Sequence, residues 1–377
     1  MKKHFLLAGF AALMLVACNN KPASELTLSG LDPVKFQTEV NNAKTALYTL
    51  KNKAGMEVCI TNFGGRIVSV MVPDKNGKMQ DVVLGFDSIA DYINVPSDFG
   101  ASIGRYANRI NQGRFALDGD TIQLPQNNFG HCLHGGPKGW QYKVYEANLI
   151  DPTTLELTLV SPDGDENFPG NVTAKVTYKL TEDNAIDIKY SATTDKKTII
   201  NMTNHSYFNL AGDPSKASTD NILYVNADYY TPVDSTFMTT GEIAPVKDTP
   251  MDFTTPHAVG ERINDKFQQL IYGAGYDHCY VLNKIETGSL DLAATCFEPN
   301  SGRTMEVYTT EAGVQLYTGN WLNGFEGAHG ATFPARSAIC FEAQCFPDTP
   351  NKPHFPSATL LPGDEYQHCL LYTSDAA

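Results

Sequence analysis

Two ionisable residues stand in segments that could carry acid–base chemistry. His205 lies in a polar and aromatic stretch at residues 203–210 (TNHSYFNL), and Glu342 lies among cysteine and apolar residues at 340–344 (CFEAQ). A neutral imidazole can be tuned to act as an acid near neutral pH. Burial would raise the pKa of the glutamate carboxyl and make it a useful base. On the residues alone, a structural histidine and a strand glutamate facing water are equally simple interpretations.

Three other segments gather polar side chains. Residues 104–110 (GRYANRI) set two arginines and an asparagine in an otherwise apolar run, and residues 275–278 (GYDH) join an aspartate to a histidine. A guanidinium buried without a partner is costly, so the arginines are paired, used for binding, or exposed on a strand. In residues 127–136 (NNFGHCLHGG), His131 and His134 invite a zinc interpretation, but no third ligand at zinc spacing is evident.

The composition of the chain disfavours several functions. Its 377 residues carry a formal charge of −14, and an acidic surface repels the phosphates of nucleic acids. The sequence lacks a P-loop, a dinucleotide-binding glycine motif and the G-x-S-x-G elbow of serine hydrolases. Residues 163–167 (DGDEN) resemble a calcium loop without its bidentate glutamate, which favours a solvated turn. Seven cysteines follow Cys18 at wide spacing, a pattern that favours buried thiols, with one bridge at most.

The N-terminus predicts export. Residues 1–17 combine two lysines, an apolar stretch and small residues, which is the pattern of a signal peptide too short to span a membrane. The sequence LVAC that ends at Cys18 resembles a bacterial lipobox, which implies that this cysteine is lipidated. We therefore expect residues 18–30 to be a lipidated tether that anchors an exported protein in the periplasm or at the cell-envelope surface. An ordinary cleaved signal and an internal anchor are the alternatives.

Short alternating segments must position the polar residues. Period-2 apolar runs separated by turn residues recur along the chain, as at 154–160, 172–180, 185–192 and 303–310. Strands at this spacing predict an all-β fold. For one domain of this length, residues 31–377, the pattern predicts a large two-sheet sandwich.

A hairpin and two helices are predicted in the N-terminal third. The apolar run at 66–73 leads through a turn at 74–77, which ends in Asn-Gly, to a second run at 81–85. Helical periodicity is weak, and the candidates are 31–51, which opens with Asp-Pro, and a single turn near 88–93.

Nine motifs together resemble those of the aldose 1-epimerase (galactose mutarotase) family, in that family's order and over about residues 55–372. They are NFGG at 62–65, GRYANRI at 104–110, LHGG at 133–136, DGDENFPG at 163–170, TNHSYFNL at 203–210, GYDH at 275–278, GVQLYTG at 313–319, EAQ at 342–344 and HFPS at 354–357. Each motif is weak alone, whereas nine in order form a specific signal. The resemblance implies a β-supersandwich with an open sugar cleft and no cofactor.

The resemblance also implies a reaction, the interconversion of α and β anomers of aldohexoses such as galactose and glucose. His205 matches the family's general acid, and Glu342 matches its general base. The sugar-binding positions are matched by Asn108, Arg109, His134, Asp277 and Gln315. The candidates for stacking on the sugar are Tyr207, Phe208 and Trp321. The implied partner is a small aldose, which is bound without a metal. The protein is expected to be a monomer or homodimer, and to contact the membrane only through its lipid.

Three alternatives stay open at this point. A carbohydrate-binding lipoprotein of the same fold would not need both His205 and Glu342. An epimerase of sugar phosphates would need a basic pocket, which the acidic composition disfavours. A zinc hydrolase would be built on His131 and His134, and metal analysis of the purified protein would identify it.

Overall fold

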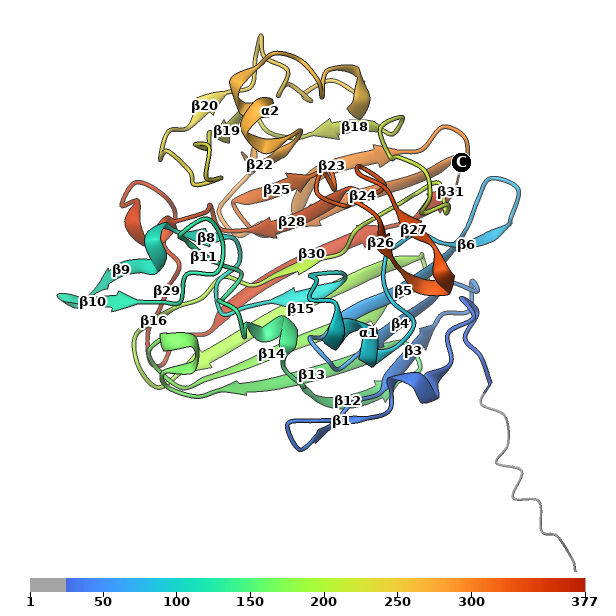
Figure 1. Cartoon of the computed structure of the whole chain (residues 1–377), viewed down its shortest axis with the longest axis horizontal. Helices are drawn as coiled ribbons and strands as arrows, with labels where there is room; N and C mark the ends of the chain where they lie inside the picture. Colours follow the sequence, from blue (N-terminus) through green and yellow to red (C-terminus); the bar gives the residue numbers. More distant parts are fainter. Residues whose placement is uncertain (1–24, 377) are drawn as a thin grey trace, which may run out of the picture.

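The computed structural model describes residues 25–376, and strands dominate that part of the chain (Figure 1). The predicted signal peptide, Cys18 and part of the predicted tether lie outside the described residues. The described part contains two short α-helices, α1 (Ile89–Asn94) and α2 (Gln268–Gly273), and neither is long and apolar enough to cross a membrane. The all-β prediction is therefore confirmed.

A ten-stranded antiparallel sheet forms the largest layer. Its order is β12-β13-β14-β15-β30-β24-β23-β18-β21, and β31 also pairs with β24. The strands are β12 (Glu146–Asp151), β13 (Thr154–Ser161), β14 (Val172–Leu180), β15 (Ala185–Thr194), β18 (Ile222–Val225), β21 (His257–Ala258), β23 (Asp291–Phe297), β24 (Arg303–Thr309), β30 (Tyr366–Thr373) and β31 (Asp375–Ala376). Figure 1 shows the long strands β13, β14, β15 and β30 lying side by side. Their apolar side chains alternate, so one face of the sheet is buried.

Two smaller antiparallel sheets share the core of the ten-stranded sheet. The five-stranded sheet contains β20 (Ala244–Pro245), β19 (Tyr229–Thr231), β22 (Asp277–Val281), β25 (Gly313–Tyr317) and β28 (Cys340–Gln344) in that order. The four-stranded sheet contains β3 (Leu47–Lys51), β4 (Glu57–Thr61), β5 (Arg66–Pro73) and β6 (Met79–Asp81). One hydrophobic cluster includes Val58 of the four-stranded sheet, Ile188 of the ten-stranded sheet and Phe341 of the five-stranded sheet. Burial of this shared surface holds the layers together.

Short strand pairs complete the described fold. They are β1 (Glu39–Val40) with β2 (Ala43–Lys44), β7 (Ala101–Ile103) with β17 (Thr203–His205), β8 (Arg109–Ile110) with β11 (Cys132–Leu133), β9 (Arg114–Leu117) with β10 (Asp120–Gln123), β16 (Thr198–Ile199) with β29 (Thr359–Leu360), and β26 (Phe325–Glu326) with β27 (Thr332–Phe333). The pairs β7–β17 and β8–β11 carry residues of the cavity described below.

Most predicted elements are confirmed, but the helix expected at 31–51 is wrong. Only a 3₁₀ turn forms there, at Pro33–Phe36, and β1, β2 and β3 follow it. Asn41 and Asn42 have φ angles of 50° and 63°, which close a tight hairpin between β1 and β2. Strand β3 pairs with β4 along its whole length, and this tertiary pairing overrides the weak helical pattern of the sequence.

The predicted hairpin at 66–85 is present with its second strand shifted. Strand β6 begins at Met79 and ends at Asp81, whereas the expected run was 81–85. Asp81 Oδ1 accepts the N–H groups of Val70 and Val83, so a side chain takes the place of the ladder partner and stops the strand.

The seven described cysteines are all free thiols, and six of them are buried. The prediction of buried thiols is confirmed for these six, and no bridge forms among the cysteines of the described residues.

Candidate active site

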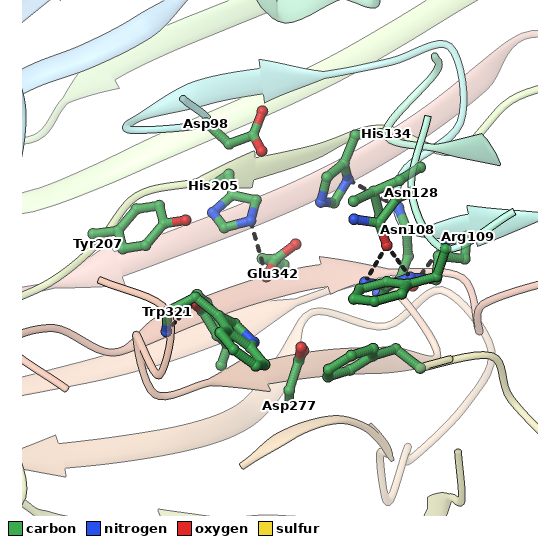
Figure 2. Close-up of a pocket in the computed structure, with 14 residues that line it drawn as sticks. Asp98, Asn108, Arg109, Asn128, His134, His205, Tyr207, Asp277, Trp321 and Glu342 are labelled. Carbon is green, nitrogen blue, oxygen red and sulfur yellow. Dashed lines mark hydrogen bonds and ion pairs between the residues drawn. The ribbon is translucent and has the colours of Figure 1, made fainter. Parts of the chain in front are cut away.

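A cavity of about 280 Å³ gathers six of the seven residues expected to bind or convert a sugar (Figure 2). These six are Asn108, Arg109, His134, His205, Asp277 and Glu342. The other lining residues are Asp98, Asn128, Phe129, Leu133, Tyr207, Phe237, Tyr317 and Trp321. Gln315, the seventh expected residue, does not line the cavity and instead donates from Nε2 to Asp277 Oδ1 at 2.7 Å.

Two strands of the five-stranded sheet, β22 and β28, deliver the two expected carboxylates from either side of β25. Glu342 in β28 lies directly opposite Gln315 in β25, which in turn pairs with β22, the strand that begins at Asp277. Directly opposite residues of an antiparallel pair project from the same face, so register alone brings Gln315 beside Glu342. All five residues of β28 are buried, and the carboxyl of Glu342 is thereby enclosed in protein.

The imidazole of His205 lies beside Glu342. Strand β17 ends at His205, and the carbonyl of this residue accepts the N–H of Gly100 at 3.0 Å. His205 Nε2 and Glu342 Oε1 are 3.4 Å apart, and both side chains are almost completely buried. The ring of Tyr207 stacks on the imidazole with centroids 5.0 Å apart. A potential proton donor and a potential proton acceptor therefore stand together at the cavity.

A reciprocal backbone contact fixes His134. The Asn108 N–H donates to His134 Nδ1, and the His134 N–H donates to the Asn108 carbonyl, both at 3.1 Å. Because Nδ1 accepts, the neutral ring carries its proton on Nε2. Arg109 donates from Nε and Nη2 to Asn128 Oδ1, which orients its guanidinium along the cavity wall. These contacts fix the orientation of both side chains at the cavity.

Burial dominates the electrostatics of the cavity. It raises the pKa of Glu342 well above its ordinary value, and Arg109 only partly opposes this shift. It also raises the pKa of Asp277 and lowers that of His205. Burial lowers the pKa of His134 to about 3, so this imidazole is neutral near pH 7. The site thus favours the neutral forms of its ionisable side chains, as desolvation requires.

Aromatic rings form one rim of the cavity. Tyr207 and Trp321 line it as expected, and Phe129 and Phe237 add to them. The centroids of Phe129 and Phe237 are 5.4 Å apart, and those of Phe237 and Trp321 are 6.2 Å apart. Phe208 was expected in this role but packs in the hydrophobic core, because side chains of successive extended residues point to opposite faces.

The zinc interpretation built on His131 and His134 is not supported by the geometry. The ring of His131 contacts Thr236 through Nε2 at 2.9 Å, whereas His134 faces His205. Among the described residues, the group with suitable spacing for a metal is Asp98, His134 and His205, whose ligand atoms lie within 4.8 Å of one another. Within the part of the chain that the structure describes, metal-binding spacing therefore occurs among three residues that all line the acid–base cavity.

Two residues show what the sequence patterns left unresolved. Arg105, in the motif at 104–110, is paired inside the protein, donating to Ser161 Oγ and to the Pro169 carbonyl at 2.7 Å each. Asp98 lines the cavity but stands in no motif, and no sequence signal distinguished it. Its place depends on where the chain before β7 passes, which only the fold defines.

Comparisons with known proteins identify the family of this chain. The model of the aldose 1-epimerase family matches residues 46–373. Galactose mutarotase of Homo sapiens is 40% identical over 325 residues, which cover 85% of this chain and 92% of that protein. Aldose 1-epimerase of Escherichia coli is 36% identical, with 86% of this chain and 94% of the relative covered. The crystal structure of a GalM/aldose epimerase homologue from C. elegans superposes with a TM-score of 0.82 at 30% identity, covering 88% of this chain and 99% of that one.

Proposed function

Because this chain belongs to the aldose 1-epimerase family and is an isomerase of aldose anomers, we propose that Glu342 and His205 are its general base and general acid. The observation that carries this assignment is the 3.4 Å separation of Glu342 Oε1 and His205 Nε2 at a cavity lined with hydrogen-bonding groups. A pair so close can serve neighbouring oxygens of one small substrate. In an aldose, those are the C1 hydroxyl and the ring oxygen.

Ring opening requires two proton transfers in one step. Glu342 removes the proton of the C1 hydroxyl, C1 becomes a carbonyl, the bond from C1 to the ring oxygen breaks, and His205 gives a proton to that oxygen. Half a turn about the C1–C2 bond presents the other face of the carbonyl. Closure then runs with the two roles reversed. Arg109, His134 and Asp277 hold the rest of the sugar while C1 turns.

The two transfers together leave Glu342 with one more proton and His205 with one fewer. Before ring opening the carboxylate and the imidazolium are required, and afterwards both side chains are neutral. Burial raises the pKa of Glu342 and lowers that of His205, so the protein favours the neutral pair. Contacts with the substrate must therefore stabilise the charged pair. The charged pair and the neutral pair must stay close in energy so that the reaction runs in both directions.

Galactose and glucose are the substrates we propose. The relatives that match most of this chain are named galactose mutarotase and aldose 1-epimerase. Among the described residues that line the cavity, Arg109 is the one arginine or lysine, and it is already engaged with Asn128. This arrangement suits neutral hydroxyl groups better than a phosphate.

Polarimetry of freshly dissolved α-galactose and α-glucose tests the assignment. The wild-type protein should accelerate mutarotation of both, whereas Glu342→Gln and His205→Asn should each lose roughly 10²–10⁴-fold in rate. Because the two groups act in one step, the double variant should lose much less than the product of the single losses. Wild-type binding of either sugar without acceleration would instead identify a lectin of this fold.

We also propose that the chain is a lipoprotein whose residues 31–377 act as one domain. The lipobox-like sequence before Cys18 and the polar segment that follows it support the anchor. Cys18→Ala should release the protein from cell membranes or stall its processing. Wild-type protein that is wholly released and begins at residue 19 or later would contradict the anchor without affecting the catalytic proposal.

A further inference from the structure

Asp98 lies in the cavity without a role in the proton transfers described above. Figure 2 shows its side chain above His205, on the opposite side from Asp277. One carboxylate oxygen of Asp98 and one ring nitrogen each of His134 and His205 lie within 4.8 Å of one another. Within the described chain, Asp98 Oδ1 is buried and has no hydrogen-bond partner. Asp98 as a whole is half-buried, so the unpaired oxygen on the cavity side is the feature that needs a reason.

Backbone groups of the residues next to Asp98 are held by hydrogen bonds. Arg66 is completely buried, and its guanidinium donates to the Phe99 carbonyl at 2.9 Å and to the Ser97 carbonyl at 3.0 Å. Next to this segment, the Gly100 N–H donates to the carbonyl of His205 at 3.0 Å. The same short segment therefore carries Asp98 and contacts the backbone of His205. Its fixed geometry sets the distance between the carboxyl and the imidazole.

The groups around the His205 imidazole differ in their effect on its charge. The titratable and charged neighbours from the packed elements are Glu342, His134, Tyr207, Tyr317, Arg66 and Asp98. Burial lowers the pKa of His205, and Arg66 adds to that effect. The carboxyl of Asp98 opposes both and favours the imidazolium. Glu342 cannot play this constant part, because the proposed mechanism requires it to gain and lose a proton in each cycle.

We propose that Asp98 is a positioning residue for the general acid, and that its carboxylate stabilises the imidazolium of His205 that donates to the ring oxygen. The proposal rests on the acid role proposed for His205. Asp98 forms no bond with the substrate in this scheme and exchanges no proton. It sets the pH range in which His205 is protonated, and so the alkaline limit of activity.

Asp98→Asn tests the proposal, because it removes the charge and keeps the shape. Loss of an opposite charge at this distance typically moves a pKa by about 1–3 units. The alkaline limb of the pH–rate profile should move to lower pH by about 1–2 units, with kcat roughly 10- to 100-fold lower on the alkaline side and KM little changed. Asp98→Glu, which restores the charge, should recover part of the loss. Asp91→Asn, a matched change in α1 outside the cavity, should leave the profile unmoved.

An NMR titration of the His205 ring gives a second readout that does not depend on turnover. Its pKa should fall in Asp98→Asn relative to the wild type, whatever part His205 plays in the reaction. An unchanged titration, or a rate lowered by one factor at every pH, would overturn the proposal. So would a rise in KM alone, or a bound metal that the wild type contains and Asp98→Asn lacks. Full activity of His205→Asn would refute the acid assignment itself and leave the titration result standing.

Discussion

Strands β14 and β28 place their polar residues in opposite ways. In β14, of the ten-stranded sheet, buried and exposed positions alternate, and every buried residue is apolar or aromatic. In β28, of the five-stranded sheet, all five residues are buried, and Glu342 and Gln344 are among them. Burial of apolar area favours folding, whereas a buried carboxyl without a partner opposes it. The burial pattern of β14 is therefore explained by stability, whereas the buried carboxyl of β28 requires another explanation.

Unpartnered atoms show where that reason lies. Within the described chain, Glu342 Oε2 and His205 Nδ1 are buried and accept or donate no hydrogen bond. On the other sheet, the hydroxyl of Tyr178 is buried but donates to the Gly65 carbonyl at 2.6 Å. Sites that bind substrates keep polar groups unpaired at a cost in stability. Within the described chain, β28 carries an unpaired buried carboxylate oxygen at the cavity, whereas no buried polar side-chain atom of β14 lacks a partner. Variants in the two sheets can test whether function and stability divide between them.

Glu342→Gln should give the largest effect on activity. Loss of the base should lower kcat roughly 10²–10⁴-fold, while thermal stability stays the same or rises. Glu306→Gln, the same change on β24 of the ten-stranded sheet, is the matched control and should leave kcat unchanged. Mutarotation of galactose by Glu342→Gln within a few-fold of wild type would remove Glu342 as the base and make Asp277 the next candidate.

The stability gain of Glu342→Gln should depend on pH in a defined direction. Burial raises the pKa of Glu342 in the folded state above its value in the unfolded chain. Between these two pKa values the folded state binds more protons, so this residue makes the protein less stable as pH rises. The glutamine variant lacks this penalty. Its advantage in melting temperature over wild type should therefore grow from acidic to neutral pH, and an advantage that shrinks over this range would contradict the buried-carboxyl argument.

Ile188→Ala should have the largest effect on stability. Ile188 lies in β15, is fully buried and belongs to the core cluster shared by the sheets. Truncation of such a side chain costs about 2–5 kcal/mol through lost burial and the cavity left behind. Urea unfolding should show this loss, while kcat/KM of the folded variant stays near wild type. A normal stability with reduced kcat would break the division between the sheets.

The same division explains which features the sequence predicted. Strand β14 was predicted with both ends correct, because period-2 alternation is a local property of the chain. His205 and Glu342 stood out because polar groups interrupted apolar or aromatic runs. Asp98 could not be found in this way, since its proximity to His205 comes from the pairing of β7 with β17, far apart in the sequence. The β1–β2 hairpin was missed because Asn41 and Asn42 were not weighed as a turn signal.

Gln315→Leu should have an intermediate effect, on substrate binding. The variant loses the 2.7 Å hydrogen bond to Asp277, which burial already disfavours in its charged form. Hydrogen bonds to charged groups contribute about 1.5–3 kcal/mol, so KM should rise roughly tenfold or more, with a smaller change in kcat. Gln344→Leu is the matched control, since within the described chain the Gln344 amide has no partner and does not line the cavity. It should leave KM unchanged, and equal KM values for the two leucine variants would contradict the part given to Gln315.

Lys175→Ala should have the smallest effect of this series. Lys175 lies on the solvent-facing side of β14, and its Nζ is 3.3 Å from Glu156 Oε1, with about half of the lysine side chain exposed. An exposed pair gains little from Coulomb attraction, because water and salt screen it and ordering two long side chains costs entropy. The free energy of unfolding should change by less than about 1 kcal/mol, and the change should shrink further in high salt. A double-mutant cycle with Glu156→Ala measures the pair itself. A coupling free energy well above this value would mean that exposed polar pairs of the ten-stranded sheet also contribute substantially to stability. Strands β14 and β28 would then differ only in how deeply their polar residues are buried.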